Sequence, residues 1–226
     1  MPIDKQHAFA IGTTVSTNYN PVGGAIGKIK NLCLRQLTRG IESFYLEKAV
    51  KCFRQHALLN GESHIGPNAW CINPASKDHI QIGEGVVCRG ILRCEDFSRG
   101  KIIIHPNVYI GDDVIISCAK KIEIGEFSLL AHGVQIFDND SHPIESNSRI
   151  KDYQSIKDHD PESRPIIPSS PIKIGSRCWI GINVIILKGV TIGDGSVIGA
   201  GSVVTSSIPE NTFVAGNPFK IIKKLK

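Results

Sequence analysis

Hydrophobic residues in the C-terminal third of the chain recur every six positions without a slip. The residues at this interval are Ile174, Ile180, Ile186, Ile192, Ile198 and Val204. A short side chain stands four positions after each of the first five, at Cys178, Val184, Val190, Ser196 and Ser202. Neither an α-helix, which repeats about every 3.6 residues, nor a strand, which alternates, produces this spacing. It is typical of a parallel β-helix, in which three sides close one coil of about eighteen residues.

The same interval recurs earlier in the chain, with slips. The earlier runs are Ile65 and Cys71; Ile82, Cys88 and Cys94; Ile104, Ile110 and Ile116; and, after a slip of two residues, Ile124, Leu130 and Ile136. A solenoid tolerates slips, because extra residues can loop out at a corner while the coils continue to stack. The pattern predicts a mainly β fold with a β-helix over residues 61–208, an N-terminal arm and helical cap over 1–60, and a tail over 209–226.

A helical period marks residues 24–59, where apolar residues recur at steps of three and four. This pattern predicts one or two amphipathic helices, broken near Gly40. We expect them to cover the open end of the first coil, and their basic residues are also compatible with peripheral attachment to an anionic membrane surface. After Val204 the chain is expected to end in a short basic amphipathic C-terminal helix.

The β-helix pattern is interrupted once, over residues 138–171, by a polar stretch that contains Ser141-His142-Pro143-Ile144. This stretch is too long for a hairpin turn. Long loops without secondary structure in a compact domain are usually functional or disordered. We therefore place the candidate chemistry in this loop.

Four motifs occur in a fixed order over roughly residues 100–224. They are Ser141-His142-Pro143-Ile144, Cys178-Trp179-Ile180-Gly181, Gly199-Ala200-Gly201-Ser202-Val203-Val204-Thr205 and Ala215-Gly216-Asn217-Pro218. In this order they resemble the hexapeptide-repeat acyltransferases, specifically the galactoside, maltose, nodulation and capsule O-acetyltransferases. The resemblance implies a left-handed parallel β-helix, a homotrimer, acetyl-coenzyme A as donor and a hydroxyl acceptor, commonly on a sugar.

The resemblance implies that His142 is the catalytic base. A sugar hydroxyl is a poor nucleophile at neutral pH, and a positioned imidazole that removes its proton helps by about 10²–10⁴-fold. Asp138 and Asp140 are near enough in sequence to orient the ring or to bind substrate, and Asp140 is taken as a substrate contact. Asp113 stands where the galactoside enzymes carry a substrate-contacting Asn, which it resembles as an acceptor but not as a donor.

The resemblance also implies the remaining site residues. Trp179 is expected to face outward beside the catalytic cleft, where it would stack on a sugar or close on the thioester. A backbone N–H near Gly181 and Ile182 is expected to stabilise the oxyanion. The donor's pantetheine arm is expected near the following residues and its phosphates near two lysines: Ala200, Thr205, Lys220 and Lys223.

Composition narrows the classes of function. The net charge of +5 is modest, aromatic residues are 6% of the chain, and no nucleic-acid module is recognisable, which argues against nucleic-acid binding. The seven cysteines include no CxxC motif, and Cys71, Cys88, Cys94 and Cys178 are interpreted as small hydrophobic residues in a reducing compartment. No signal peptide or membrane span is evident, so we expect a cytoplasmic protein. A zinc site from His105, His132 and His142 lacks its family's accompanying pattern, and no metal is expected.

Together these features predict an acetyl-coenzyme A dependent O-acetyltransferase that acts on a carbohydrate hydroxyl, in surface polysaccharide or glycan biosynthesis. Transfer is expected to be direct, in a ternary complex. Two alternatives stay open. One is an N-acetyltransferase of a nucleotide-linked amino sugar, which shares the fold and the donor. The other is a catalytically silent trimeric scaffold.

Overall fold

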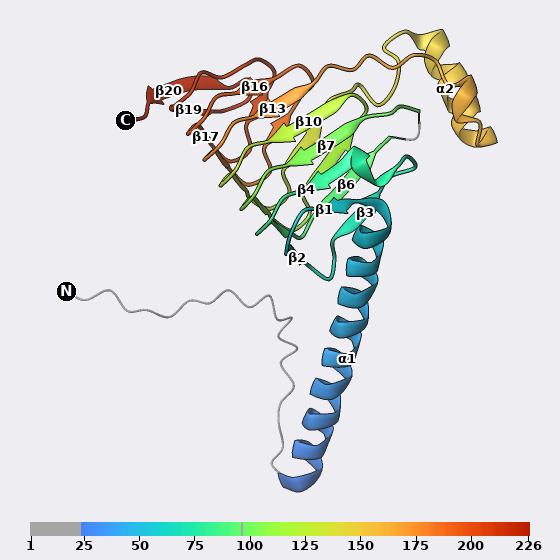
Figure 1. The fold of residues 1–226 in the computed structure, drawn as a ribbon, viewed down its shortest axis with the longest axis vertical. Helices are drawn as coiled ribbons and strands as arrows, with labels where there is room; N and C mark the ends of the chain where they lie inside the picture. The colour runs from blue at the N-terminus through green and yellow to red at the C-terminus, as the bar shows by residue number, and fades with distance from the viewer. Residues whose placement is uncertain (1–23, 96) are drawn as a thin grey trace. The chain divides into compact units, whose positions relative to one another are not determined.

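The structure is a computed structural model that describes residues 24–95 and 97–226 (Figure 1). The arm expected over residues 1–23 lies outside the described residues. The chain divides into two compact units, Met1–Gly40 and Ile41–Lys226. The second unit contains the whole β-helix.

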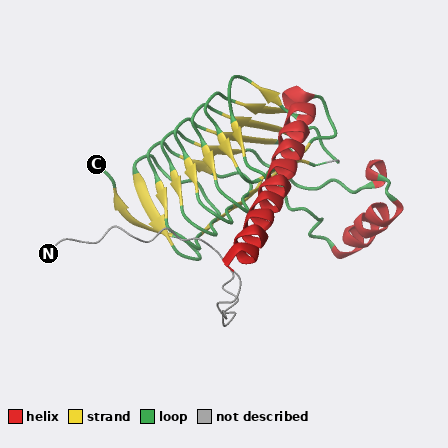
Figure 2. Ribbon diagram, turned by 90° about the horizontal axis from the view of Figure 1, so that it is seen from below, coloured by secondary structure: helices red, strands yellow, loops and turns green. Residues whose placement is uncertain are grey.

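Short strands form three walls, and successive strands of one coil belong to successive walls (Figure 2). Wall A consists of β1 (Leu58–Leu59), β4 (Ile80–Ile82), β7 (Lys101–Ile104), β10 (Lys121–Ile124), β13 (Ile172–Ile174) and β16 (Thr191–Ile192). Wall B consists of β2 (His64–Ile65), β5 (Val87–Cys88), β8 (Tyr109–Ile110), β11 (Leu129–Leu130), β14 (Trp179–Ile180), β17 (Val197–Ile198), β19 (Thr212–Ala215) and β20 (Lys220–Lys224). Wall C consists of β3 (Trp70–Ile72), β6 (Ile91–Cys94), β9 (Ile115–Cys118), β12 (Gln135–Phe137), β15 (Ile185–Ile186) and β18 (Val203–Val204).

The six-residue interval lines the core as predicted. On wall A, Ile124 pairs in register with Ile174, and Ile174 with Ile192. The short side chains four positions later are equally buried, with Cys178 1% exposed and Ser196 0%. Each buried isoleucine contributes about 1.5–3 kcal/mol through the hydrophobic effect. The left-handed parallel β-helix expected from the sequence is confirmed.

The slips in the interval lie at one corner, where the chain passes from wall C to wall A. Between β9 and β10 the corner is widened, and the buried carboxylate of Asp138 stabilises it. The backbone N–H groups of Ala119, Lys120 and Lys121 donate to this carboxylate at 2.6, 2.8 and 2.8 Å. The longest connection at this corner joins β12 to β13. It is the polar stretch 138–171, which we call the insert.

The N-terminal helix α1 (Gly24–His56) is continuous, so the expected break at Gly40 is wrong. A glycine costs a helix about 1 kcal/mol relative to alanine, and good helix formers on either side offset that cost. The end of α1 packs on the first coil as expected. Phe53 is fully buried, and the Cys52 thiol donates to the Cys71 carbonyl at 3.1 Å. No helix among the described residues combines the length and hydrophobicity that crossing a bilayer requires.

The C-terminal tail forms a strand rather than the expected helix. Strand β20 pairs antiparallel with β19, with Ile221 opposite Val214. The basic residues repeat in a way that suits a helix, but β-branched Ile221 and Ile222 favour a strand, and pairing covers the otherwise open edge of β19. Wall B therefore ends in a hairpin.

The cysteines within the β-helix are structural, as predicted. Cys71, Cys88, Cys94 and Cys178 are all buried and free. Burial raises the pKa of the Cys88 thiol to about 12, so that the thiolate does not form near neutral pH.

Candidate active site

The insert contains a helix that the sequence pattern did not predict. Helix α2 (Ser146–Asp158) begins after Glu145, whose carboxylate accepts the N–H groups of Asn147 and Ser148 at 2.8 and 2.6 Å. It ends at His159, which adopts a left-handed conformation (φ 54°), and the short helix η2 (Pro161–Ser163) follows. Because α2 buries few residues, its sequence carries no apolar stripe, and the polar pattern predicts a loop instead.

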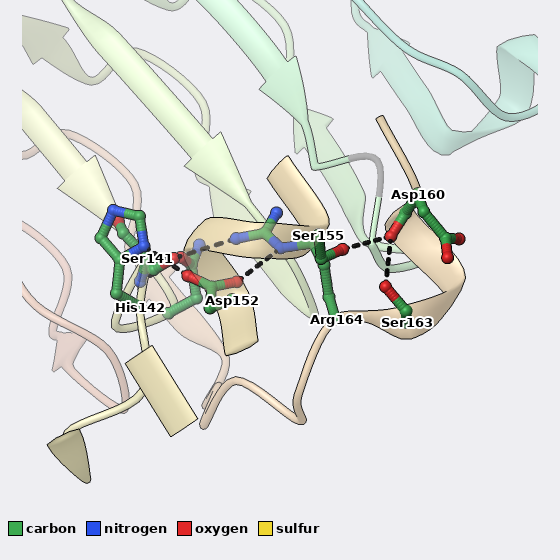
Figure 3. Close-up of polar contacts among 8 residues, drawn as sticks. Ser141, His142, Asp152, Ser155, Asp160, Ser163 and Arg164 are labelled. Atoms are coloured by element: carbon green, nitrogen blue, oxygen red, sulfur yellow. Dashed lines mark hydrogen bonds and ion pairs between the residues drawn. The ribbon is translucent and has the colours of Figure 1, made fainter. Parts of the chain in front are cut away.

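His142 precedes α2 and contacts a carboxylate on that helix (Figure 3). The Nδ1 atom of His142 lies 2.6 Å from Oδ2 of Asp152. The His142 side chain is 59% exposed, whereas that of Asp152 is 1% exposed. Nδ1 of the imidazole is therefore held by the buried carboxylate, while the rest of the ring is accessible to solvent.

Arg164 holds the other side of Asp152. Its Nε donates to Oδ1 of Asp152 at 2.8 Å, and its Nη2 donates to the Ser141 carbonyl at 3.3 Å. The guanidinium lies 4.3 Å from the ring centre of Phe97, and the side chain is only 9% exposed. Burial alone would raise the pKa of Asp152, but hydrogen bonds and charge from Arg164 and His142 outweigh it and lower the pKa.

Neither Asp138 nor Asp140 orients the His142 ring through its side chain. Asp138 supports the corner described above. The Asp140 carboxylate accepts a hydrogen bond from the Lys188 ammonium, and Asp140 contacts His142 only through its carbonyl, to which the His142 N–H donates at 2.6 Å. Asp152 was missed because it lies ten residues beyond His142, in a segment with no periodic signal. Substrate binding by Asp140 stays a prediction.

Most of the residues predicted to bind acetyl-coenzyme A or the oxyanion lie together on wall B. A pocket of about 610 Å³, which we call the wall-B pocket, is lined by Trp179, Gly181, Ile182, Ala200 and Lys223, among others. The Trp179 side chain faces outward as predicted and is 55% exposed. Gly181 is required by packing, because a Cβ there would lie 2.7 Å from the Ala200 nitrogen.

The backbone N–H groups of Gly181 and Ile182 are the two candidates for stabilising the oxyanion. The Gly181 N–H already donates to the Ile198 carbonyl at 2.9 Å as part of the wall-B ladder. Within the described part of the chain, no backbone acceptor pairs with the Ile182 N–H. Ile182 is therefore the better candidate, and its backbone donor role stays a prediction.

The other predicted residues lie elsewhere. Asp113 is an exposed corner residue between walls B and C with φ 57°, and its carbonyl accepts from Gln135. Thr205 is exposed at the end of β18, and Lys220 begins β20. Among the described residues, none of these three side chains makes a hydrogen bond or ion pair with His142. The structure thus groups His142 with the insert and most of the residues predicted to bind the acetyl donor with wall B.

A second cavity adjoins the insert. This corner cleft, of about 970 Å³, is formed where extra residues at the wall C to wall A corner meet residues 161–169. Its lining includes His79, Phe97, Arg99 and Arg164.

The other two histidines considered for a zinc site each have a carboxylate partner. Nε2 of His105 lies 3.2 Å from Oε1 of Glu123, and Nδ1 of His132 lies 3.5 Å from Oδ2 of Asp112. No metal-binding cluster of three or more His, Cys, Asp or Glu occurs among the described residues.

Comparisons with known proteins place this arrangement in a family. Residues 171–206 match the model described as bacterial transferase hexapeptide (six repeats). WbbJ of Escherichia coli strain K12, named provisionally as a lipopolysaccharide biosynthesis O-acetyl transferase, is 41% identical over 152 residues, which cover 64% of this chain and 71% of WbbJ.

Two solved structures share the fold. A maltose O-acetyltransferase from Clostridium difficile 630 is 32% identical, with a TM-score of 0.51 over 85% of this chain and 86% of its own. AntD, an N-acyltransferase from Bacillus cereus solved with a dTDP-amino sugar and coenzyme A, is 20% identical, with a TM-score of 0.60 over 76% and 86%. The latter likeness concerns the fold alone. Coil architecture, motif order and relatives agree: the chain is an acyltransferase that belongs to the hexapeptide-repeat family.

Proposed function

We propose that the protein is an acetyl-coenzyme A dependent O-acetyltransferase that acts on a carbohydrate hydroxyl, in polysaccharide or glycan biosynthesis. The observation that carries this proposal is an accessible imidazole, His142, held at 2.6 Å by a buried carboxylate in an acyltransferase fold. The names of WbbJ and of the maltose enzyme support a sugar hydroxyl as acceptor.

The chemistry follows from the position of His142. The outward ring nitrogen binds the acceptor hydroxyl and takes up its proton as the oxygen attacks the acetyl carbon of the thioester. The C–S bond then breaks, and the leaving thiolate of coenzyme A takes the proton from the imidazolium. When bound, acetyl-coenzyme A supplies the activated acetyl group. The Ile182 N–H stabilises the negative charge that develops on the carbonyl oxygen. Transfer is direct, so no residue of this chain needs to carry the acetyl group.

The wall-B pocket fits the donor. Its lining is mainly apolar, from Trp179, Val197, Ile198 and Phe213, which suits a long pantetheine arm. Lys223 lies at this pocket and supplies the charge that a phosphate requires. Ala200 lines the same pocket. Thr205 and Lys220 lie outside the pocket, so they would contact only a part of acetyl-coenzyme A that extends beyond it.

We infer that the complete site forms between chains of a homotrimer. His142 leaves the β-helix at the corner between walls C and A, whereas the wall-B pocket opens on a different face. The outward residues of wall B form an apolar column of Tyr109, Leu129, Trp179, Val197 and Phe213. A neighbouring copy that covers this column would bring its own His142 to the pocket.

Screening acetyl-coenzyme A turnover against glycans and amino sugars tests the function. An O-acetyl product loses its acetyl group in mild alkaline hydroxylamine, whereas an N-acetyl product keeps it. A stable product would favour the amino-sugar alternative. The absence of coenzyme A binding in calorimetry would contradict the proposed donor.

Replacing both Lys220 and Lys223 with Ala should raise the KM for acetyl-coenzyme A by roughly 5- to 30-fold and leave kcat nearly unchanged. Contacts to the donor phosphates form equally in the ground and transition states, and such uniform binding changes KM. The effect should shrink at high salt, because screening weakens the wild-type contacts. Lys224→Ala with Lys226→Ala is the matched control. An unchanged donor KM at low salt would place the phosphates elsewhere.

A further inference from the structure

The carboxylate of Asp152 divides its two oxygens between two donors. Oδ2 faces Nδ1 of His142 at 2.6 Å, and Oδ1 accepts from Nε of Arg164 at 2.8 Å. We propose that Asp152 and Arg164 are positioning residues that keep the proton of neutral His142 on Nδ1, so that Nε2 is free to act as base. This inference rests on the proposed function of His142.

The chemistry of the pair decides the tautomer. A neutral imidazole carries one proton, on either Nδ1 or Nε2, and an ionised carboxylate can only accept a hydrogen bond. A proton on Nε2 would leave two lone pairs facing each other across the 2.6 Å between Nδ1 and Oδ2. The proton therefore belongs on Nδ1, and Nε2 presents a lone pair on the accessible side of the ring.

Arg164 secures this arrangement from the other side. A guanidinium only donates, so it keeps Asp152 oriented as an acceptor and ionised inside the fold. Through its Nη2 it also holds the Ser141 carbonyl at 3.3 Å, and so ties the peptide that precedes His142 to the carboxylate that orients the ring. The Phe97 ring, 4.3 Å from the guanidinium, limits its movement.

An isosteric substitution separates this role from simple packing. In Asp152→Asn, the Nε–H of Arg164 still points at this side chain, so the amide oxygen faces Arg164 and the amide NH₂ faces His142. The NH₂ group needs a lone pair on Nδ1, which moves the proton to Nε2 and blocks the base. We expect kcat to fall at least about 100-fold, with the donor KM nearly unchanged. Asp158→Asn, on the same helix, is the control.

The tautomer itself is measurable without any acceptor. In ¹⁵N spectra of histidine-labelled protein, with His142 assigned by its loss in His142→Gln, the wild type should show a protonated Nδ1 and an unprotonated Nε2 in the neutral ring. Asp152→Asn should show the reverse. A wild-type ring protonated on Nε2 would overturn the proposal even if the Asp152 variants failed to fold.

A second substitution should restore part of the loss. In Asp152→Asn with Arg164→Met, the amide is released from Arg164 and its oxygen can again accept from Nδ1. We expect kcat at least about tenfold above that of Asp152→Asn alone, a coupling that independent sites would not show. No gain, in a double variant that melts like the wild type, would remove Arg164 from the proposal. If Asp152→Asn reversed the tautomer but kept full activity, the positioning role of Asp152 would stand and His142 would not be the base.

Discussion

The His142→Ala variant is expected to have a kcat at least about 100-fold below that of the wild type, because the acceptor hydroxyl loses its base. The KM for acetyl-coenzyme A should change little, since the residues proposed to bind it line wall B. Thermal unfolding should also change little, because the imidazole is 59% exposed and its loss leaves no cavity in the core. Initial rates at saturating donor and acceptor, with a melting curve for each protein, give the result.

A matched histidine on the same insert provides the control. His159 is exposed and lies at the end of α2, with φ 54°. Because Asn adopts this left-handed conformation readily, His159→Asn removes an imidazole without straining the chain. Its kcat should equal that of the wild type. If His142→Ala kept more than about a tenth of the wild-type kcat, the assignment of His142 as base would be wrong.

Two inactive variants should regain activity when their chains are mixed in one trimer. His142→Ala removes the base and leaves the wall-B pocket intact. Ala200→Trp fills that pocket from an exposed position and leaves His142 intact. If each site takes His142 from one chain and the pocket from its neighbour, every trimer that contains both variants has one functional site out of three.

Mixed trimers carrying two different tags, purified by both tags in turn, allow this measurement. Each variant alone should be nearly inactive, and so should the two preparations combined without exchange of chains. Trimers shown to be mixed but without recovered activity would mean that each site lies within one chain. Light scattering that gives a fully active monomer would also exclude a shared site.

The sequence alone determined the β-helix and which side chains face outward on wall B. Every coil buries an aliphatic residue at the same phase, and Ile174, Ile180 and Ile186 repeat that choice closely enough for the period to be read without coordinates. Trp179 could be placed facing outward for the same reason, because it directly precedes a buried residue in a short strand. The order and spacing of residues are enough to predict this part of the fold, because each coil repeats the one before.

Only the tertiary structure decided what surrounds His142 and how the chain ends. Asp152 and Arg164 approach His142 from α2 and from the segment after η2, and no period or short motif connects the three. The tail could be read as a helix from its basic residues, and it became strand β20 because the open edge of β19 was available for pairing. Local patterns report which face of an element is buried, whereas ion pairs and edge pairing depend on partners that folding brings together.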